Sequence, residues 1–329
     1  MKEIRIGENE ENQRIDKFLR KYMPNAPLSY LYRMIRKKDI KLNGKRTSND
    51  ATLKKDDIIA LYIKDDDLDR FTKKKKMVKA KRQFKIVYED SNILVAEKPK
   101  GLLVHGTAEE KKNTLVNQVC TYLQQKEHYS PDKEKTFVPA AVNRLDRNTS
   151  GLVIFGKNNK ALQLLNQMIR DKQMIKKYYL TIVSGEMKKP LHIKKSLIKD
   201  SAVNRVRVSN EKSADAKESE TIFKPILNNR KYTLVEAELI TGRTHQIRAH
   251  LKEAGFPLLG DEKYGNVEIN GLVKRQFGLS TQFLHAYKLK FTQGVEILSY
   301  LEGKEIVSQL PPKLKLIKEK LFNKTGDEK

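Results

Sequence analysis

Residues 143–151 read Asn-Arg-Leu-Asp-Arg-Asn-Thr-Ser-Gly and lead directly into the apolar run Leu-Val-Ile-Phe at 152–155. The polar stretch has the composition of a loop, and the apolar run is typical of a buried strand. Asp146 therefore lies in a loop between Arg144 and Arg147, whose charges favour its ionised form. An ionised aspartate can act as a nucleophile, a base or an electrostatic stabiliser. An alternative is that Asp146 only caps the turn and pairs with Arg147 at the surface.

The chain on both sides of this loop, from residue 84 to residue 329, predicts an α+β domain. Short apolar runs predict strands, and amphipathic stretches predict helices. Many strands with a few separated helices are typical of a long mixed sheet. The strands are expected at 84–88, 93–96, 175–184, 191–198, 219–226, 232–240 and 283–291, and the helices at 158–172, at 244–254 with Thr244 as its cap, and on the surface from 311 onward.

Residues 1–66 predict a smaller, separate domain. Apolar residues recur at helical spacing in 12–23, and Ser29 is the expected N-cap of a second helix. The pair Asn43-Gly44 follows a short strand and predicts a hairpin, and residues 58–63 predict a closing strand. The second helix exposes a basic face made of Arg33, Arg36, Lys37 and Lys38.

The excess of positive charge is large. The 329-residue chain carries a net charge of +26, of which +5 falls in 1–66, +6 in 67–83 and +15 in 84–329. Such an excess favours a polyanionic partner, nucleic acid ahead of a membrane, although charge can also serve solubility alone. Residues 67–83 lack periodicity and predict a flexible basic linker, either a passive tether or an arm that follows phosphates.

Composition excludes several classes of protein. The single cysteine, Cys120, rules out an internal disulfide and a metal site built from cysteines. No apolar run approaches the roughly 18 residues of a membrane span, and the N-terminus lacks the apolar core of a signal peptide. We therefore expect a cytoplasmic protein with no membrane partner, and a monomer by default.

A second candidate segment lies at 239–251. Arg243 and His245 flank a predicted helix start, a position that favours anions, and Arg248 follows one turn later. His245 and His250 are five residues apart and lack the His-Glu-x-x-His pattern. This spacing argues against a metal site.

The strand predicted at 175–184 contains two adjacent tyrosines, Tyr178 and Tyr179. Because successive side chains alternate between the faces of a strand, the two rings point to opposite sides. One is expected to pack in the core, and the other is free to stack on a nucleic-acid base.

Together these segments resemble the RluA-type RNA pseudouridine synthases, and residues 1–66 resemble the small RNA-binding domain of ribosomal protein S-four. The resemblance to the S-four domain includes residues 14–19, the basic second helix and Leu42-Asn43-Gly44. The resemblance to the synthases extends over nearly the whole chain. Its motifs are Glu97-Lys98-Pro99-Lys100-Gly101, the Arg-Leu-Asp-x-x-Thr-Ser-Gly loop at 144–151, Lys177-x-Tyr179, Gly-Arg-Thr-His-Gln-Ile-Arg at 242–248, Gly-Asp-Glu-Lys-Tyr-Gly at 260–265 and Leu284-His285-Ala286.

The resemblance implies an enzyme that flips a uridine out of its stack in RNA and isomerises it to pseudouridine. It implies that Asp146 is the catalytic aspartate, that Tyr179 stacks on the uracil and that Arg248 pairs with the aspartate. Arg144 matches the arginine that enters the space left by the flipped base. The other expected RNA contacts are Arg243 and His245 beside this site, and Arg33, Arg36, Lys37 and Lys38 in the S-four-like domain.

The implied reaction consumes nothing, so the resemblance implies no metal, nucleotide or redox cofactor. Large-subunit ribosomal RNA is the expected substrate, and transfer RNA is the open alternative. The sequence also leaves open whether Asp146 attacks C1′, adds to C6 or removes the 2′ proton.

Three residues depart from the family patterns. Asn143 stands where histidine is the commonest residue. Asp39 and Asp56 stand where glycine is common, and aspartate tolerates the left-handed backbone that glycine usually supplies.

Other classes of protein fit the sequence less well. A non-catalytic RNA-binding or ribosome-assembly protein could retain this fold, but it would not need the complete set Asp146, Tyr179 and Arg248. A glycoside hydrolase usually needs a second carboxylate across the sugar as general acid, and none is evident beside Asp146. A DNA-binding protein would be expected to show a recognition-helix motif or a zinc finger, and neither pattern is evident.

Overall fold

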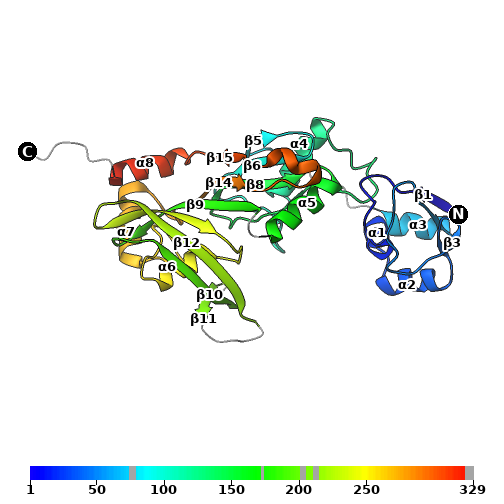
Figure 1. Ribbon diagram of the computed structural model, residues 1–329, viewed down its shortest axis with the longest axis horizontal. Coiled ribbons are helices and arrows are strands. Elements are labelled where there is room, and N and C mark those ends of the chain that lie inside the picture. Colours follow the sequence, from blue (N-terminus) through cyan, green and yellow to red (C-terminus); the bar gives the residue numbers. More distant parts are fainter. Residues whose placement is uncertain (74–78, 172–173, 201–204, 210–214, 323–329) are drawn as a thin grey trace, which may run out of the picture. The chain divides into compact units, whose positions relative to one another are not determined.

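The computed structural model describes residues 1–73, 79–171, 174–200, 205–209 and 215–322 (Figure 1). Within these ranges no helix is long and apolar enough to cross a membrane. Contacts group the chain into two units, the first with residues 1–82, 116–140 and 156–163, and the second with 83–115, 141–155 and 164–329. The predicted domain limits at residues 66 and 83 stay a prediction.

The first unit contains a four-stranded antiparallel sheet of order β1-β4-β2-β3. Its strands are β1 (Lys2–Arg5), β2 (Ile40–Leu42), β3 (Lys45–Arg46) and β4 (Ile58–Leu61). The two predicted helices are confirmed as α1 (Ile15–Tyr22) and α2 (Leu28–Arg36). Their apolar faces meet in one core, which includes Phe18, Leu19, Leu31, Met34 and Ile35.

The predicted cap of α2 was wrong. The helix begins at Leu28, so that Ser29 already lies inside it, and no side chain caps its first turn. Pro27 precedes the helix with a φ of −60°, and the fixed backbone angle of proline suits the entry to a helix.

The predicted hairpin turn is confirmed. Asn43 and Gly44 have φ angles of 51° and 74°, the pattern of a type I′ turn. Asp56 adopts the expected left-handed conformation, with φ 69°. At Asp39, the other departure in this unit, the preceding residue Lys38 adopts the left-handed conformation instead, with φ 66°. The turn there ends α2, and in it the Asp39 amide donates to the Met34 carbonyl at 2.9 Å.

A third helix, α3 (Asp65–Thr72), occupies the beginning of the predicted linker, so the prediction was wrong for residues 67–72. Leu68 and Phe71 are buried in the core of the unit, and this burial stabilises the helix. Three aspartates in its first turn suit the positive end of the helix dipole. Residues 74–78, which include three of the basic residues of the predicted linker, lie outside the described residues.

The second unit is built on an eleven-stranded sheet, which confirms the predicted mixed α+β fold. The strand order is β11-β10-β12-β13-β9-β14-β8-β6-β5, with β15 paired to β14 and β7 to β8. Strands β14 and β8 run parallel, and the pairs from β11 to β14 are antiparallel. The strands are β5 (Lys85–Glu89), β6 (Ile93–Lys98), β7 (Ala140–Ala141), β8 (Ser150–Gly156), β9 (Ile175–Ser184), β10 (Leu191–Asp200), β11 (Arg205–Ser209), β12 (Lys217–Asn228), β13 (Tyr232–Leu239), β14 (Leu284–Phe291) and β15 (Glu305–Val307).

The remaining helices of the described chain include the three that the sequence predicted. They are α4 (Leu115–Gln125), α5 (Asn159–Arg170), α6 (Gln246–Glu253), α7 (Val267–Phe277), α8 (Pro312–Phe322) and the 3-10 helix η1 (Glu296–Leu301). Thr244 does not cap α6 as predicted. His245 precedes the helix in a left-handed conformation, and the Gln246 carboxamide binds the preceding loop by accepting from the Thr241 hydroxyl and the Arg243 amide.

Helix α6 is attached to the sheet through a fully buried histidine. His250 Nε2 lies 2.8 Å from Ser219 Oγ, and Nδ1 lies 3.1 Å from Thr221 Oγ1, both on β12. Burial, together with the nearby charge of Lys195, lowers the pKa of His250 to about 4. The ring is therefore neutral at pH 7.

We predict that acid destabilises the second unit through His250. Unfolding returns the ring to its ordinary pKa of 6.5, so the unfolded chain binds an extra proton between that pH and about 4. The free energy of unfolding should then fall with pH by up to about 1.4 kcal/mol per unit. His250→Gln keeps polar contacts but does not titrate, so its stability should fall less between pH 7 and pH 5. Denaturant melts at both pH values measure this, and equal losses in both proteins would contradict it.

Candidate active site

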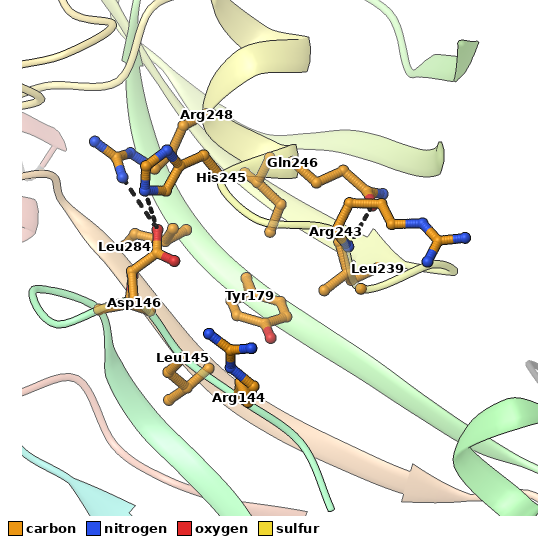
Figure 2. Close-up of a pocket in the computed structure, with 13 residues that line it drawn as sticks. Arg144, Leu145, Asp146, Tyr179, Leu239, Arg243, His245, Gln246, Arg248 and Leu284 are labelled. Carbon is orange, nitrogen blue, oxygen red and sulfur yellow. Dashed lines mark hydrogen bonds and ion pairs between the residues drawn. The ribbon is translucent and has the colours of Figure 1, made fainter. Parts of the chain in front are cut away.

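A pocket opens in the second unit where the loop before β8, strand β9 and the start of α6 meet (Figure 2). The pocket brings together six residues that the sequence singled out: Arg144, Asp146, Tyr179, Arg243, His245 and Arg248. Its apolar walls come from Leu145, Leu239, Ile247 and Leu284. A wider hollow shares several of these residues and adds the basic side chains of Arg147, Lys199 and Lys263.

The loop that carries Asp146 is bound to strand β8 by Asn143. The Asn143 carboxamide donates to the Leu152 carbonyl at 3.1 Å and accepts from the Ile154 amide at 2.8 Å. The side chain therefore bonds to β8 as a neighbouring strand would. The residue that departs from the family pattern thus has a structural role here.

A fully buried lysine holds the same loop from its other end. Lys98 Nζ donates to the carbonyls of Pro99, Leu102 and Arg147 at 2.9, 2.7 and 3.0 Å. Burial lowers the pKa of Lys98 to about 7, and the negative charge of Asp146 acts in the opposite direction. Three carbonyl acceptors match the three N–H donors of an ammonium group. Lys98 therefore fixes the backbone immediately after Asp146.

The carboxylate of Asp146 pairs with Arg248 and not with Arg147. Arg248 Nη1 donates to Asp146 Oδ2 at 3.1 Å, whereas Arg147 lies 3.3 Å from Glu110. The surface pairing that the sequence left as an alternative is therefore not present. The two partners, Asp146 and Arg248, are 102 residues apart in the chain.

A second carboxylate holds Arg248 in place. Arg248 Nε and Nη2 donate to the two oxygens of Asp261 at 2.6 and 2.8 Å. Asp261 is fully buried, and burial alone would raise its pKa, but the bonds and charge of Arg248 and two backbone amides keep that pKa below its usual range. Because Asp261 takes two donors of the guanidinium group, Arg248 meets Asp146 through Nη1 alone. Among the described residues, no hydrogen bond reaches Asp146 Oδ1, which leaves that oxygen available to a substrate.

His245 lies beside the same carboxylate. Its Nε2 is 3.9 Å from Asp146 Oδ2, and its Nδ1 is 3.1 Å from the Tyr264 hydroxyl. Tyr264 in turn accepts a hydrogen bond from the Val206 amide at 2.7 Å. Burial lowers the pKa of His245, partly opposed by the charge of Asp146. A neutral imidazole is thus held within reach of the pocket.

Tyr179 supplies a flat apolar surface in the pocket. On β9 it faces Ala237 of β13 and Ala286 of β14, and these small cross-strand neighbours leave room for its ring. Figure 2 shows the ring beside Asp146 and Arg144. Burial, with the charge of Asp146, raises the pKa of Tyr179, so its hydroxyl keeps its proton at neutral pH. Tyr178 points to the other face of the sheet, with the Lys288 ammonium 4.4 Å from its ring centroid.

The other predicted RNA contacts lie on exposed surface. Arg144 is exposed at the pocket, and Arg243 is exposed with its Nε bonded to the Glu218 carbonyl at 3.1 Å. Four more predicted contacts belong to the first unit and lie outside this pocket, exposed on α2 or just after it: Arg33, Arg36, Lys37 and Lys38.

Sequence reasoning missed the roles of Lys98, Asp261 and Tyr264. All three lie in segments of the family resemblance, but none has a spacing that predicts a contact with the catalytic loop or with Arg248. Their functions depend on burial and on contacts between distant segments. Within the described residues, no group of three or more His, Cys, Asp or Glu side chains is placed to hold a metal ion.

Comparisons with known proteins identify the family of the chain. A family model described as RNA pseudouridylate synthase matches residues 92–253. The ribosomal large subunit pseudouridine synthase C of Vibrio vulnificus is 35% identical over 295 residues, 88% of this chain and 88% of that protein. An uncharacterized RNA pseudouridine synthase of Mycoplasma capricolum is 32% identical over 307 residues, 92% of this chain and 95% of that protein.

A solved structure has the same fold. Human RNA Pseudouridylate Synthase Domain Containing 4 aligns with a TM-score of 0.54 and 24% identity, over 70% of this chain and 90% of that one. On the sequence similarity, the chain belongs to the RNA pseudouridylate synthase family and is an RNA pseudouridine synthase. The resemblance to the RNA pseudouridine synthases is thereby confirmed, and the resemblance of residues 1–66 to the S-four domain stays a prediction.

We predict that Asp261→Asn both destabilises the second unit and impairs the enzyme. Removing one partner of a buried ion pair costs about 3–5 kcal/mol, because the other charge stays buried. The carboxamide keeps one acceptor for Arg248, so one guanidinium donor is released and can bind the second oxygen of Asp146. Pseudouridine formation should fall further than RNA affinity does, measured below the melting temperature of the variant. Asp132→Asn makes the same change at an exposed aspartate outside the pocket and should match the wild type, and an Asp261→Asn protein as stable and active as that control would contradict the prediction.

Proposed function

We propose that this enzyme isomerises specific uridines to pseudouridine in large-subunit ribosomal RNA, with Asp146 acting on a flipped-out uridine. The carboxylate of Asp146 carries the proposal, because it stands in the pocket with one oxygen paired to Arg248 and the other open. In the reaction the N1–C1′ bond breaks and a C5–C1′ bond forms. The proton leaves C5 and one is gained at N1, so the product is an isomer of the substrate.

The pocket supports the roles proposed for its other residues. Taking a base out of its stack costs a few kcal/mol, which contacts to the flipped nucleotide must offset. The buried ring of Tyr179 is suited to stacking on uracil, and the exposed guanidinium of Arg144 is suited to entering the vacated space. Arg248 orients Asp146 inside a partly enclosed site, where fixed charges act more strongly than in water.

Holding the RNA falls to the exposed basic residues in this proposal. Arg243 and His245 act beside the pocket, and residues 73–83 join an RNA-binding domain, which includes helix α3, to the catalytic domain at 84–329. In the first unit the proposed contacts are Arg33, Arg36, Lys37 and Lys38. Large-subunit RNA is favoured over transfer RNA because relatives similar to most of this chain are named ribosomal large subunit pseudouridine synthase C.

In this proposal the enzyme works in the cytoplasm, a reducing compartment that suits its single cysteine, and a monomer is the default state. Mapping pseudouridines in total RNA from cells with and without the gene tests the substrate. Loss of sites from large-subunit ribosomal RNA is expected, whereas loss confined to transfer RNA would overturn the choice of substrate.

We predict that Asp146→Asn abolishes pseudouridine formation and leaves RNA affinity nearly intact. The substitution preserves the shape of the side chain but removes the negative charge that the reaction uses. Modified sites in an RNA transcript incubated with the variant are counted by sequencing, and binding is measured separately. Asp132→Asn, at an exposed aspartate outside the pocket, is the matched control. Full activity of Asp146→Asn would remove Asp146 from its proposed role.

We predict that Arg248→Ala lowers turnover more than affinity for RNA. Only Nη1 of Arg248 reaches Asp146, and the rest of the side chain is buried, so its loss affects the orientation of the carboxylate. Single-turnover rates at saturating enzyme separate chemistry from binding. A variant with an unchanged rate at saturation and weakened binding would assign Arg248 to substrate affinity instead.

A further inference from the structure

The first unit has a hollow of its own, between the beginning of α2 and the end of α3. It has a volume of about 720 Å³, within the range of roughly 300–1,000 Å³ that is usual for small-ligand pockets. Tyr30 and Phe71 supply its aromatic wall. Its rim carries three exposed guanidinium groups, those of Arg33, Arg36 and Arg70.

The two aromatic rings of this hollow contact each other, and each carries a guanidinium group beside it. The ring centroids of Tyr30 and Phe71 are 4.9 Å apart at an interplanar angle of 52°. The Arg33 guanidinium lies 5.3 Å from the Tyr30 centroid, and the Arg70 guanidinium lies 4.7 Å from the Phe71 centroid. Phe71 is buried in the core, whereas Tyr30 is only partly buried and can offer its ring to a ligand.

The charge of the hollow is mostly uncompensated. Among the described residues, Arg33 and Arg36 have no acidic partner within ion-pair distance, and Arg70 pairs with Asp67 at 2.8 Å. The position of α3 is fixed by Asn25, whose amide nitrogen Nδ2 donates to the carbonyls of Arg70 and Lys73 at 3.3 and 2.8 Å. The aromatic and basic groups are therefore held together by the fold.

We propose that this hollow binds one unpaired nucleotide of the RNA, with the base against Tyr30 and its phosphate among Arg33, Arg36 and Arg70. Bases stack on aromatic rings whatever their sequence, and arginine binds phosphate through paired donors. An acidic peptide would satisfy the arginines but would leave the tyrosine surface without a stacking partner. The inference rests on the proposed RNA substrate and adds to it a stacking surface, Tyr30, and a third phosphate contact, Arg70, in the first unit.

The two kinds of contact should give different binding signatures, measured by anisotropy of a fluorescent single-stranded oligouridylate over a range of salt concentrations. Tyr30→Leu should weaken binding roughly five- to a hundredfold and leave the salt dependence unchanged, because stacking releases no counterions. The double variant Arg33→Gln/Arg70→Gln should lower the slope of log affinity against log salt by about 0.7 for each lost phosphate contact. Arg20→Gln, at an exposed arginine on α1, is the control, because it also removes one positive charge per substitution.

Each outcome decides between proposals. The exposed arginine variants should fold normally, so they test the site even if Tyr30→Leu melts early through lost packing on Phe71. If the variants bind like Arg20→Gln while wild-type enzyme forms pseudouridine in a large-subunit RNA transcript, the nucleotide site is wrong and the proposed function stands. If the wild type forms none, the proposed function fails whatever the variants bind. A polyglutamate peptide is used as a competitor for the bound oligouridylate. If it displaces the oligouridylate equally well from the wild type and from Tyr30→Leu, the nucleotide site is wrong and an acidic protein is the favoured partner.

Discussion

The buried guanidinium of Arg248, shared between two carboxylates, is the interaction on which the active site depends. Moving an arginine from water into a protein interior is costly unless its charge and donors are matched. Asp261 supplies that match with two short bonds and lies fully buried beneath it. Asp146 then needs to contribute only one oxygen, and its second oxygen faces the pocket. A single arginine facing Asp146 without Asp261 could take both oxygens and leave neither open to the pocket.

The backbone around Asp146 is fixed as firmly as its side chain. Lys98 and Asn143 hold the two ends of the loop, and Gly151 marks the point where β8 passes β14. Gly151 has a φ of 119°, and a Cβ there would lie 2.2 Å from the Ala286 carbonyl oxygen. Only glycine permits this close approach. The loop that carries Asp146 therefore ends at a point where strand spacing leaves little freedom, which limits the positions available to Asp146.

Local patterns predicted the elements of this structure better than the contacts between them. The apolar spacing in α1 and the run in β9 each gave an element correctly, because burial on one face is written into neighbouring residues. The helix α3 was missed because its charged residues concealed the pair Leu68 and Phe71. The pairing of Arg248 with Asp146 came from family resemblance and not from spacing. The bonds of Lys98 and Asp261 could not be read from sequence at all, because they join segments that only the folded sheet brings together.

Arginine performs two physically different tasks in this chain, and net charge does not separate them. Exposed arginines, such as Arg33 and Arg36, keep their charge in water and are suited to phosphates through contacts that salt weakens. Arg248 is buried among opposite charges, so it contributes little to the field outside the protein and much to the geometry inside. Affinity based on many exposed charges tolerates loose geometry. An active site that relies on one buried arginine does not, and this division lets the same +26 chain hold a flexible polyanion while orienting a single carboxylate.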